Sequence, residues 1–343
     1  MTTKKRNLIM GIGAVLVVLA ALVPELHHQP LTLLQRTRKV TRVKDWDAKH
    51  DNYFWISNSE VLLVTQANGP AYGGVLPVLV RRVNAVTGSV TVDKALTARL
   101  QRSTQLDTSD WQLSPDSRWL LCHNDSRRWV AASLDGAHLM TWPLQGDGSG
   151  ESGILTAWLP DGRSWIQAVE DQQTTHTYLY QLNKSTVTDH SGNFGLDGLE
   201  VVGFYGPTRL LTILPQTGDG GGVSMADYDI LNPAASSHFY FQYVPPNMDI
   251  QQVRLSPDRS RLAWKFTVKP LPLGLRATIN SNYVRRSSPV TAGLWTSDLN
   301  CNNLHEVGTV DIRDDQITNL RWTPDGKRLS FIDGDTLYTI PAD

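Results

Sequence analysis

Apolar and polar residues alternate in short runs along most of the chain beyond residue 38. The runs RLAWKF (261–266) and RLSFI (328–332) are typical of this pattern. A period of two places successive side chains on opposite faces of a strand. The pattern therefore predicts many short β-strands with one face in a core, and no helical periodicity is expected between them.

The same turn motif recurs between these runs. Four strong copies carry a Pro-Asp pair: Pro115-Asp116, Pro160-Asp161-Gly162, Pro257-Asp258 and Pro324-Asp325-Gly326. Two weaker copies are centred on Asn58 and Pro207. Proline pre-sets φ at the second turn position, aspartate tolerates the bent backbone, and glycine accepts a positive φ. The motif predicts six repeat units of about 50 residues, each built on a hairpin.

Each unit contains more than this hairpin. Segments 175–183, 224–232 and 292–300 supply a third strand and end in similar turns. Four short strands per unit make a propeller blade, and blades pack around an axis until a ring closes. The sequence therefore predicts an all-β fold, a six-bladed β-propeller over residues 38–343. The alternative is a β-sandwich in which Pro-Asp turns recur by chance.

The sixth unit is incomplete as a blade. After Pro324 only two strands follow, so the outermost strand is missing. The segment 35–45 precedes the first unit, and we expect Lys39–Val43 to complete the sixth blade and close the ring. This segment is basic, and the run is interpreted as a solvated edge strand, with contact to membrane head groups or anionic glycans as the alternative. Its basic residues are Arg36, Arg38, Lys39, Arg42 and Lys44.

The amino-terminal segment is predicted to lie in a membrane. Three basic residues at positions 4–6 precede an uncharged apolar run over residues 8–23. A helix of this length spans roughly 24 Å, slightly less than a typical bilayer core. The basic side stays in the cytoplasm, so residues 1–7 are expected there and the later residues outside it. The run is interpreted as a retained signal anchor followed by a linker at 24–37; the alternative is a cleaved signal peptide and a secreted propeller.

The Pro-Asp repeats resemble the WD40-like PD40 repeats of TolB-type six-bladed propellers. The resemblance extends from about Val40 to Asp343 and rests on the following motifs: Ser114-Pro115-Asp116, Leu159-Pro160-Asp161-Gly162-Arg163, Ser256-Pro257-Asp258 and Thr323-Pro324-Asp325-Gly326-Lys327. It implies the fold, which occurs in periplasmic scaffolds and in peptidase gating domains. TolB has an additional amino-terminal α/β domain, for which too few residues precede the first blade here. The resemblance therefore does not extend to the role of TolB, nor to a peptidase domain.

Composition narrows the function classes. The 32 basic and 33 acidic residues nearly balance, so nothing marks the chain as a nucleic-acid-binding protein. The two cysteines, Cys122 and Cys301, have no metal-ligand spacing, and neither a metal site nor a cofactor is expected. The stretch 222–226 resembles a nucleophile elbow around Ser224, but it leads into a predicted strand rather than a helix. No catalytic residue is therefore assigned.

The longest insertion, Val268–Val290, lies between two predicted strands of the fifth unit. Long loops on rigid scaffolds often carry binding residues. Arginine and tyrosine are enriched in interface hot spots, so the candidate partner-binding residues are Arg276, Tyr283, Arg285 and Arg286. A surface insertion without function is the alternative.

Together these features predict a membrane-tethered, extracytoplasmic propeller that binds a protein or peptide of the cell envelope through loops around its central mouth. Such a scaffold is expected to be monomeric and non-enzymatic. The alternative is a hydrolase or lyase with an active site in the central funnel, acting on an envelope polymer. Carboxylates or histidines converging on the axis would favour the enzyme, whereas an apolar, aromatic-rich mouth would favour the binding protein.

Overall fold

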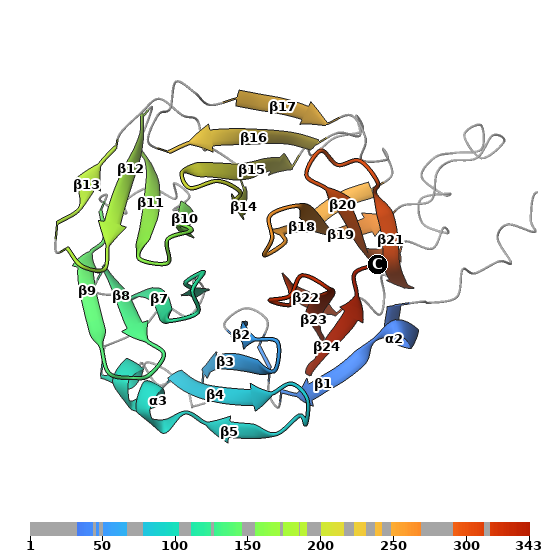
Figure 1. Cartoon of the computed structure of the whole chain (residues 1–343), viewed down its shortest axis with the longest axis horizontal. Helices are drawn as coiled ribbons and strands as arrows, with labels where there is room; N and C mark the ends of the chain where they lie inside the picture. Colours follow the sequence, from blue (N-terminus) through green and yellow to red (C-terminus); the bar gives the residue numbers. More distant parts are fainter. Residues whose placement is uncertain are drawn as a thin grey trace, which may run out of the picture.

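A computed structural model gives the fold of the chain. The structure describes residues 33–43, 46–47, 51–66, 78–102, 111–124, 127–145, 155–171, 174–184, 186–190, 200–215, 223–230, 237–241, 248–268, 291–311 and 316–343. In these ranges the strands form six four-stranded antiparallel sheets arranged around a central axis (Figure 1). The predicted six-bladed propeller of four-stranded blades is confirmed. The predicted apolar helix at 8–23 lies outside the described residues.

The first three blades follow one another along the chain, each from its innermost strand outward (Figure 1). Blade 1 contains β2 (Asn52–Ser57), β3 (Glu60–Gln66), β4 (Val78–Asn84) and β5 (Val90–Val92). Blade 2 contains β6 (Gln112–Leu113), β7 (Trp119–Asn124), β8 (Arg128–Ser133) and β9 (Leu139–Pro143). Blade 3 contains β10 (Leu155–Trp158), β11 (Ser164–Asp171), β12 (Thr174–Gln181) and β13 (Thr188–Asp189).

The next two blades have the same order. Blade 4 contains β14 (Glu200–Phe204), β15 (Arg209–Pro215), β16 (Val223–Asp229) and β17 (Ser237–Phe241). Blade 5 contains β18 (Met248–Leu255), β19 (Arg261–Val268), β20 (Thr291–Asp298) and β21 (His305–Asp311).

The sixth blade combines strands from both ends of the described chain. Its inner strands are β22 (Ile317–Trp322), β23 (Arg328–Asp333) and β24 (Thr336–Pro341). Its outermost strand is β1 (Arg38–Arg42), which lies antiparallel to β24 with Arg38 opposite Thr339 (Figure 1). The ring is therefore closed by a strand that precedes all the other described strands. We call the interface between blades 6 and 1 the closure seam.

Each Pro-Asp turn joins the innermost strand of a blade to the next strand outward. The aspartate accepts a hydrogen bond from the backbone N–H two residues later, for example from Arg163 N to Asp161 at 2.8 Å and from Lys327 N to Asp325 at 3.0 Å. The residue after the aspartate has a positive φ in all four turns: Ser117 56°, Gly162 64°, Arg259 63° and Gly326 66°. Glycine adopts this conformation without a Cβ clash, which explains why it follows two of the four Pro-Asp pairs.

One helix between the strands was not predicted. α3 (Lys94–Gln101) follows β5, and the Asp93 side chain caps it by accepting a hydrogen bond from Leu96 N–H at 3.0 Å. Leu96 and Leu100 lie one turn apart and are fully buried between blades 1 and 2. The expectation that no helix interrupts the strands, and with it a purely all-β chain, is therefore wrong at this position.

A second, one-turn helix precedes the ring. α2 (Leu33–Arg36) falls in the stretch expected to be a linker. Its Leu33 is fully buried in the cluster shared by blades 5 and 6, and a Cβ on Gly308 would lie 2.8 Å from the Leu33 Cα. Gly308 therefore allows the chain to approach blade 5 closely before it enters β1.

The hydrophobic core is divided among the interfaces between blades. Six buried clusters occur among the described residues, and each joins side chains from two neighbouring blades. The cluster of the closure seam includes Val40 of β1, Tyr53 and Trp55 of blade 1, and Ile332 and Leu337 of blade 6. Each blade is thus covered on both faces, and the stability of one blade depends on its neighbours.

Candidate ligand-binding site at the closure seam

The predicted partner-binding residues Arg276, Tyr283, Arg285 and Arg286 lie outside the described residues. The strands that flank them are described: β19 ends at Val268 and β20 begins at Thr291. Because β19 starts at the Pro-Asp turn of blade 5, its far end lies at the opposite face of the ring. The insertion therefore leaves and re-enters the propeller at the face opposite the Pro-Asp turns.

The other sequence candidates occupy ordinary strand positions. Ser224 lies inside β16, opposite Leu214 and Tyr240, and not at a strand–turn–helix elbow. Cys122 and His123 are neighbours in β7, so their side chains point to opposite faces. Within the described ranges, no three His, Cys, Asp or Glu side chains are grouped so as to hold a metal ion. The helices in those ranges lack the length and apolar character needed to cross a bilayer.

One arginine on an inner strand packs against aromatic rings, and none of the described carboxylates forms an ion pair with it. Arg321 lies in β22, and its guanidinium carbon is 5.4 Å from the ring centre of Tyr53 and 4.5 Å from that of Phe54, both in blade 1. Its Nε is closed to solvent and makes no hydrogen bond. Burial lowers the pKa of Arg321 to about 10; Tyr53 opposes the shift, and the positive charge of Arg254 adds to it. Arg321 remains charged at neutral pH, held by two ring faces.

A bulge in β22 positions this side chain. Asn319 has a φ of 55°, and its carbonyl oxygen accepts a hydrogen bond from the Tyr53 hydroxyl at 2.7 Å. The same hydroxyl lies 3.0 Å from Ser330 Oγ, to which Trp55 Nε1 donates at 2.8 Å. Burial raises the pKa of Tyr53, so the hydroxyl keeps its proton. These bonds fix blade 1 against blade 6 and hold the aromatic rings under Arg321.

A groove opens on the Pro-Asp turn face of the same seam. Its cavity volume is about 80 Å³, and its walls come from β1, from the Pro-Asp turn of blade 6 and from two turns of blade 1. We call it the closure groove. The residues that define its chemistry are Arg38, Trp55, Asn58, Val86, Asp325 and Arg328.

The two arginines of the closure groove each have one backbone acceptor. Arg38 Nη2 donates to Val86 O at 3.2 Å, and Arg328 Nη2 donates to Thr339 O at 3.2 Å. Among the described residues, neither guanidinium has a carboxylate within ion-pair distance. Burial lowers the pKa of Arg328, and the charge of Arg38 lowers it further. The groove therefore holds two cations whose mutual repulsion is only partly offset.

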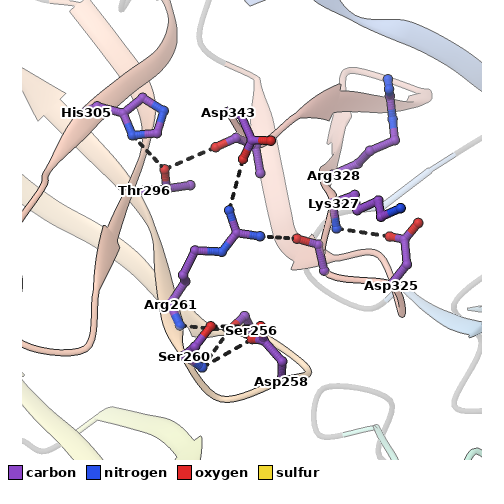
Figure 2. Close-up of polar contacts among 12 residues, drawn as sticks. Ser256, Asp258, Ser260, Arg261, Thr296, His305, Asp325, Lys327, Arg328 and Asp343 are labelled. Atoms are coloured by element: carbon purple, nitrogen blue, oxygen red, sulfur yellow. Dashed lines mark hydrogen bonds and ion pairs between the residues drawn. The ribbon is translucent and has the colours of Figure 1, made fainter.

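The aspartate of the closure groove, Asp325, accepts hydrogen bonds from its own turn. Asp325 Oδ1 accepts hydrogen bonds from Thr323 Oγ1 at 2.7 Å and from Lys327 N at 3.0 Å. Burial alone raises the pKa of Asp325, but these two bonds and the charge of Lys327 outweigh it, and the pKa is lowered. Figure 2 shows Arg328 pointing away from this carboxylate.

An arginine at the neighbouring seam, between blades 5 and 6, is paired differently. Arg261 Nη1 donates to Asp343 Oδ1 at 3.0 Å and Nη2 donates to Gly326 O, contacts that link the two blades (Figure 2). Its guanidinium carbon also lies 4.9 Å from the centre of the Trp322 ring. This seam supplies a carboxylate for its arginine, whereas at the closure seam no carboxylate of the described ranges pairs with Arg38, Arg321 or Arg328.

The basic run at β1 is only partly a solvated edge. Arg42 Nε pairs with Asp335 Oδ2 at 2.5 Å on the surface, whereas Arg36 donates to the carbonyl oxygens of Val307 and Asp343. Arg38 enters the closure groove. Strand pairing thus gives each arginine of the run a different environment.

Sequence reasoning did not identify Arg321 or the closure groove. One signal was present: when the repeats are aligned on their prolines, Arg254 and Arg321 fall three residues before the proline, where blades 2 and 3 have Gln112 and Ala157. An arginine at this inner-strand position therefore distinguishes blades 5 and 6. The proximity of Arg38 to Arg328 depends on the register of β1 against β24, which the predicted closure by Lys39–Val43 did not specify.

The comparisons with known proteins concern the fold alone. No family model matches the sequence, and no curated protein sequence matches it. TolB from Acinetobacter baumannii is similar in structure, with a TM-score of 0.46 and 12% identity over 83% of this chain and 64% of that chain. An oligogalacturonate lyase in complex with manganese has a TM-score of 0.49 and 11% identity over 89% of this chain and 90% of that chain. A chain of a mitotic checkpoint complex has a TM-score of 0.47 and 12% identity over 90% and 93%.

This chain spans less than two-thirds of the TolB chain that it matches. The class of fold is defined by the strand pairing described above. The protein is a six-bladed β-propeller.

Proposed function

We propose that this chain is a membrane-tethered, extracytoplasmic propeller that binds a protein or peptide through the mouth of its ring, as a scaffold rather than an enzyme. The observation that carries the proposal is Arg321, an inner-strand cation with a buried, unbonded Nε. The Arg321 side chain is only partly buried, so an acidic group of a partner can reach its exposed part and offset the desolvation of the charge. Arg254, at the same repeat position in blade 5, adds positive charge nearby.

The proposed location follows from the amino-terminal sequence. Residues 8–23 are apolar and uncharged, and basic residues precede them. In this arrangement residues 1–7 stay in the cytoplasm, and the propeller lies in the periplasm or at the cell surface as a monomer. The insertion at 268–290 joins strands at the face opposite the Pro-Asp turns and is proposed as a separate partner contact, made by Arg276, Tyr283, Arg285 and Arg286.

The test is crosslinking in intact cells with tagged full-length protein, followed by mass spectrometry of the proteins that co-purify. The variants are Arg321→Gln and a deletion of residues 269–288. Arg163→Gln is the matched control, because Arg163 is an exposed arginine in a Pro-Asp turn of blade 3. Purified variants are compared by circular dichroism so that a loss of binding is not a loss of folding.

A near-stoichiometric partner that is retained by Arg163→Gln and lost from Arg321→Gln supports the proposal. Loss with the 269–288 deletion as well would show that the same partner also needs the insertion at the opposite face. If no partner is enriched with the wild-type chain, or if Arg321→Gln retains it fully, the proposed binding through the mouth is wrong.

A further inference from the structure

We propose that the closure groove is a second binding site, which takes the carboxylate of an acidic side chain in an extended peptide segment of a partner. The groove lies on the Pro-Asp turn face, where Arg38 and Arg328 converge from β1 and β23. It shares no residue with the Arg321 contact described above. The inference does not depend on the proposed function, and it is tested with a purified chain and a synthetic peptide.

The groove offers donors in excess of acceptors. A guanidinium carries five N–H donors, and one bond to a backbone oxygen leaves most of them available on both Arg38 and Arg328. Asn58 Oδ1 accepts a hydrogen bond from Asp325 N at 3.0 Å, and its amide Nδ2 makes no hydrogen bond to the described residues. A ligand that fits these groups must be rich in acceptor oxygens.

The charge of the groove matches one carboxylate. Two arginines and Asp325 leave one net positive charge, and the carboxylate of Asp325 is already bonded within its turn. A bidentate carboxylate between the guanidinium groups would screen their repulsion, which adds to burial in lowering the pKa of Arg328.

The size and polarity of the groove favour a peptide side chain over a sugar or a bulky anion. A water molecule needs a cavity volume of at least roughly 10–15 Å³. The closure groove, with a cavity volume of about 80 Å³, therefore holds a carboxylate with one or two methylene groups. Trp55 and Val86 line the groove and can cover the apolar stem of the side chain. The amide of Asn58 is then placed to donate to a backbone carbonyl beside it.

The experiment uses the full-length chain in neutral detergent micelles, labelled with 5-fluorotryptophan. The fluorine resonance of Trp55, assigned through Trp55→Phe, reports on the groove. The probe is the blocked tripeptide Ac-Gly-Glu-Gly-NH2, and Ac-Gly-Gln-Gly-NH2 is its uncharged counterpart. We expect saturable movement of the Trp55 resonance with a Kd of roughly millimolar, and about tenfold weaker binding of the glutamine peptide.

Three variants sharpen the result. Arg38→Gln and Arg328→Gln should each weaken binding of the glutamate peptide about fivefold or more. Arg38 is exposed, so Arg38→Gln tests the groove even where Arg328→Gln disturbs folding. Asp325→Asn should instead increase the affinity for the glutamate peptide, because it removes the negative charge beside the ligand. A purely structural role of these residues would not make one substitution strengthen binding while the other two weaken it.

Four results would overturn the proposal. They are an unmoved Trp55 resonance at saturating peptide, equal binding of the glutamate and glutamine peptides, equal affinity for sodium acetate, and movement of the resonance by phosphatidylserine added to the micelles but not by peptide. The third result would indicate a site for small anions, and the fourth a site for lipid head groups.

Discussion

The seam between blades 2 and 3 and the closure seam are built around similar polar centres. Between blades 2 and 3, Trp165 stacks on Tyr180 with ring centres 5.0 Å apart and meets Trp142 edge-on at 4.7 Å. The buried amide oxygen of Gln167 accepts hydrogen bonds from Trp129 Nε1 at 2.9 Å and from the Tyr180 hydroxyl at 2.6 Å. This seam is held by neutral groups, and its central acceptor is fully used.

In the closure seam, the central acceptor is Ser330, which comes from the first blade of the seam, whereas Gln167 comes from the second. Its hydroxyl oxygen accepts from Trp55 Nε1 and bonds with the Tyr53 hydroxyl. The difference is the charge around this centre: Arg321 lies above the aromatic rings, and Arg38 and Arg328 line the groove beside them.

The comparison separates stability from binding. Neutral aromatic packing suffices to join two blades, as blades 2 and 3 show, so the fold does not require cations at the closure seam. A partly buried cation without a carboxylate partner costs desolvation free energy. A charged group that costs desolvation free energy and is not required to join the blades is a candidate for a ligand contact.

The largest expected effect comes from removing β1. Deleting residues 35–45 takes Val40 and Val43 out of the closure seam and leaves the outer edge of β24 unpaired. We expect a loss of unfolding free energy larger than that of any single substitution, and a broadened urea transition followed by circular dichroism. Lys39→Ser, which changes an exposed side chain but keeps β1, is the control. Unchanged thermal stability of the deletion would show that β1 is dispensable for closure.

The second effect tests the neutral seam. Trp165→Ala removes a fully buried ring at the centre of the aromatic cluster, and we expect a loss of about 3–5 kcal/mol of unfolding free energy. The measurement is urea unfolding followed by near-ultraviolet circular dichroism. Arg163→Ala, in the exposed turn of the same blade, should change the value by less than about 0.5 kcal/mol. A loss below about 1 kcal/mol for Trp165→Ala would mean that the aromatic cluster does not join these blades.

A smaller effect concerns acid. The hydrogen bond from the Ser256 hydroxyl lowers the pKa of Asp258, with help from Ser260, and the pKa of Asp325 is lowered as well. A folded-state pKa below the unfolded value gives stability that is present above about pH 4, the unfolded pKa, and is lost as pH falls through the folded pKa. Ser256→Ala should therefore be less stable than wild type at pH 7, with a shallower decline of unfolding free energy below pH 4. Parallel pH profiles for the two proteins would contradict this account.

The smallest effect on stability is expected at Arg321. Arg321→Met keeps most of the side-chain volume, and relief of the desolvated charge offsets the loss of its two ring contacts. We expect the unfolding free energy to stay within about 1 kcal/mol of wild type, while capture of the partner is lost. A loss comparable with that of Trp165→Ala would place Arg321 among the residues that hold the ring together and would remove the argument for binding there.

The sequence predicted the blades because their determinants are local. The Pro-Asp turns and the alternating runs act over a few residues, and the six sheets follow from them. The helix α3 also had a local signal, the Asp93 cap and the Leu96–Leu100 pair, which the strong strand periodicity on either side obscured.

The candidate site was beyond sequence reasoning for a different reason. Arg38 and Arg328 are distant in the chain, and only the pairing of β1 with β24 brings them to one groove. The contact of Arg321 with blade 1 depends on the bulge at Asn319, and no turn motif in the sequence predicts this bulge. The residues that sequence reasoning favoured, at 276–286, lie outside the described ranges and stay predictions.

Ring closure by β1 also has a consequence for the order of events in folding. Among the described strands, β1 comes first in the sequence and its partner β24 comes last. In a nascent chain, the strands of blades 1 to 5 can pair as they are synthesised. β1 stays unpaired until the last hairpin, β23–β24, has formed. The chain entropy of this long loop is lost in one late step, when β1 pairs with β24. Until that step, the open ring exposes strand edges. We therefore expect closure to be the slowest phase of refolding, and the open ring to be the species most prone to aggregation.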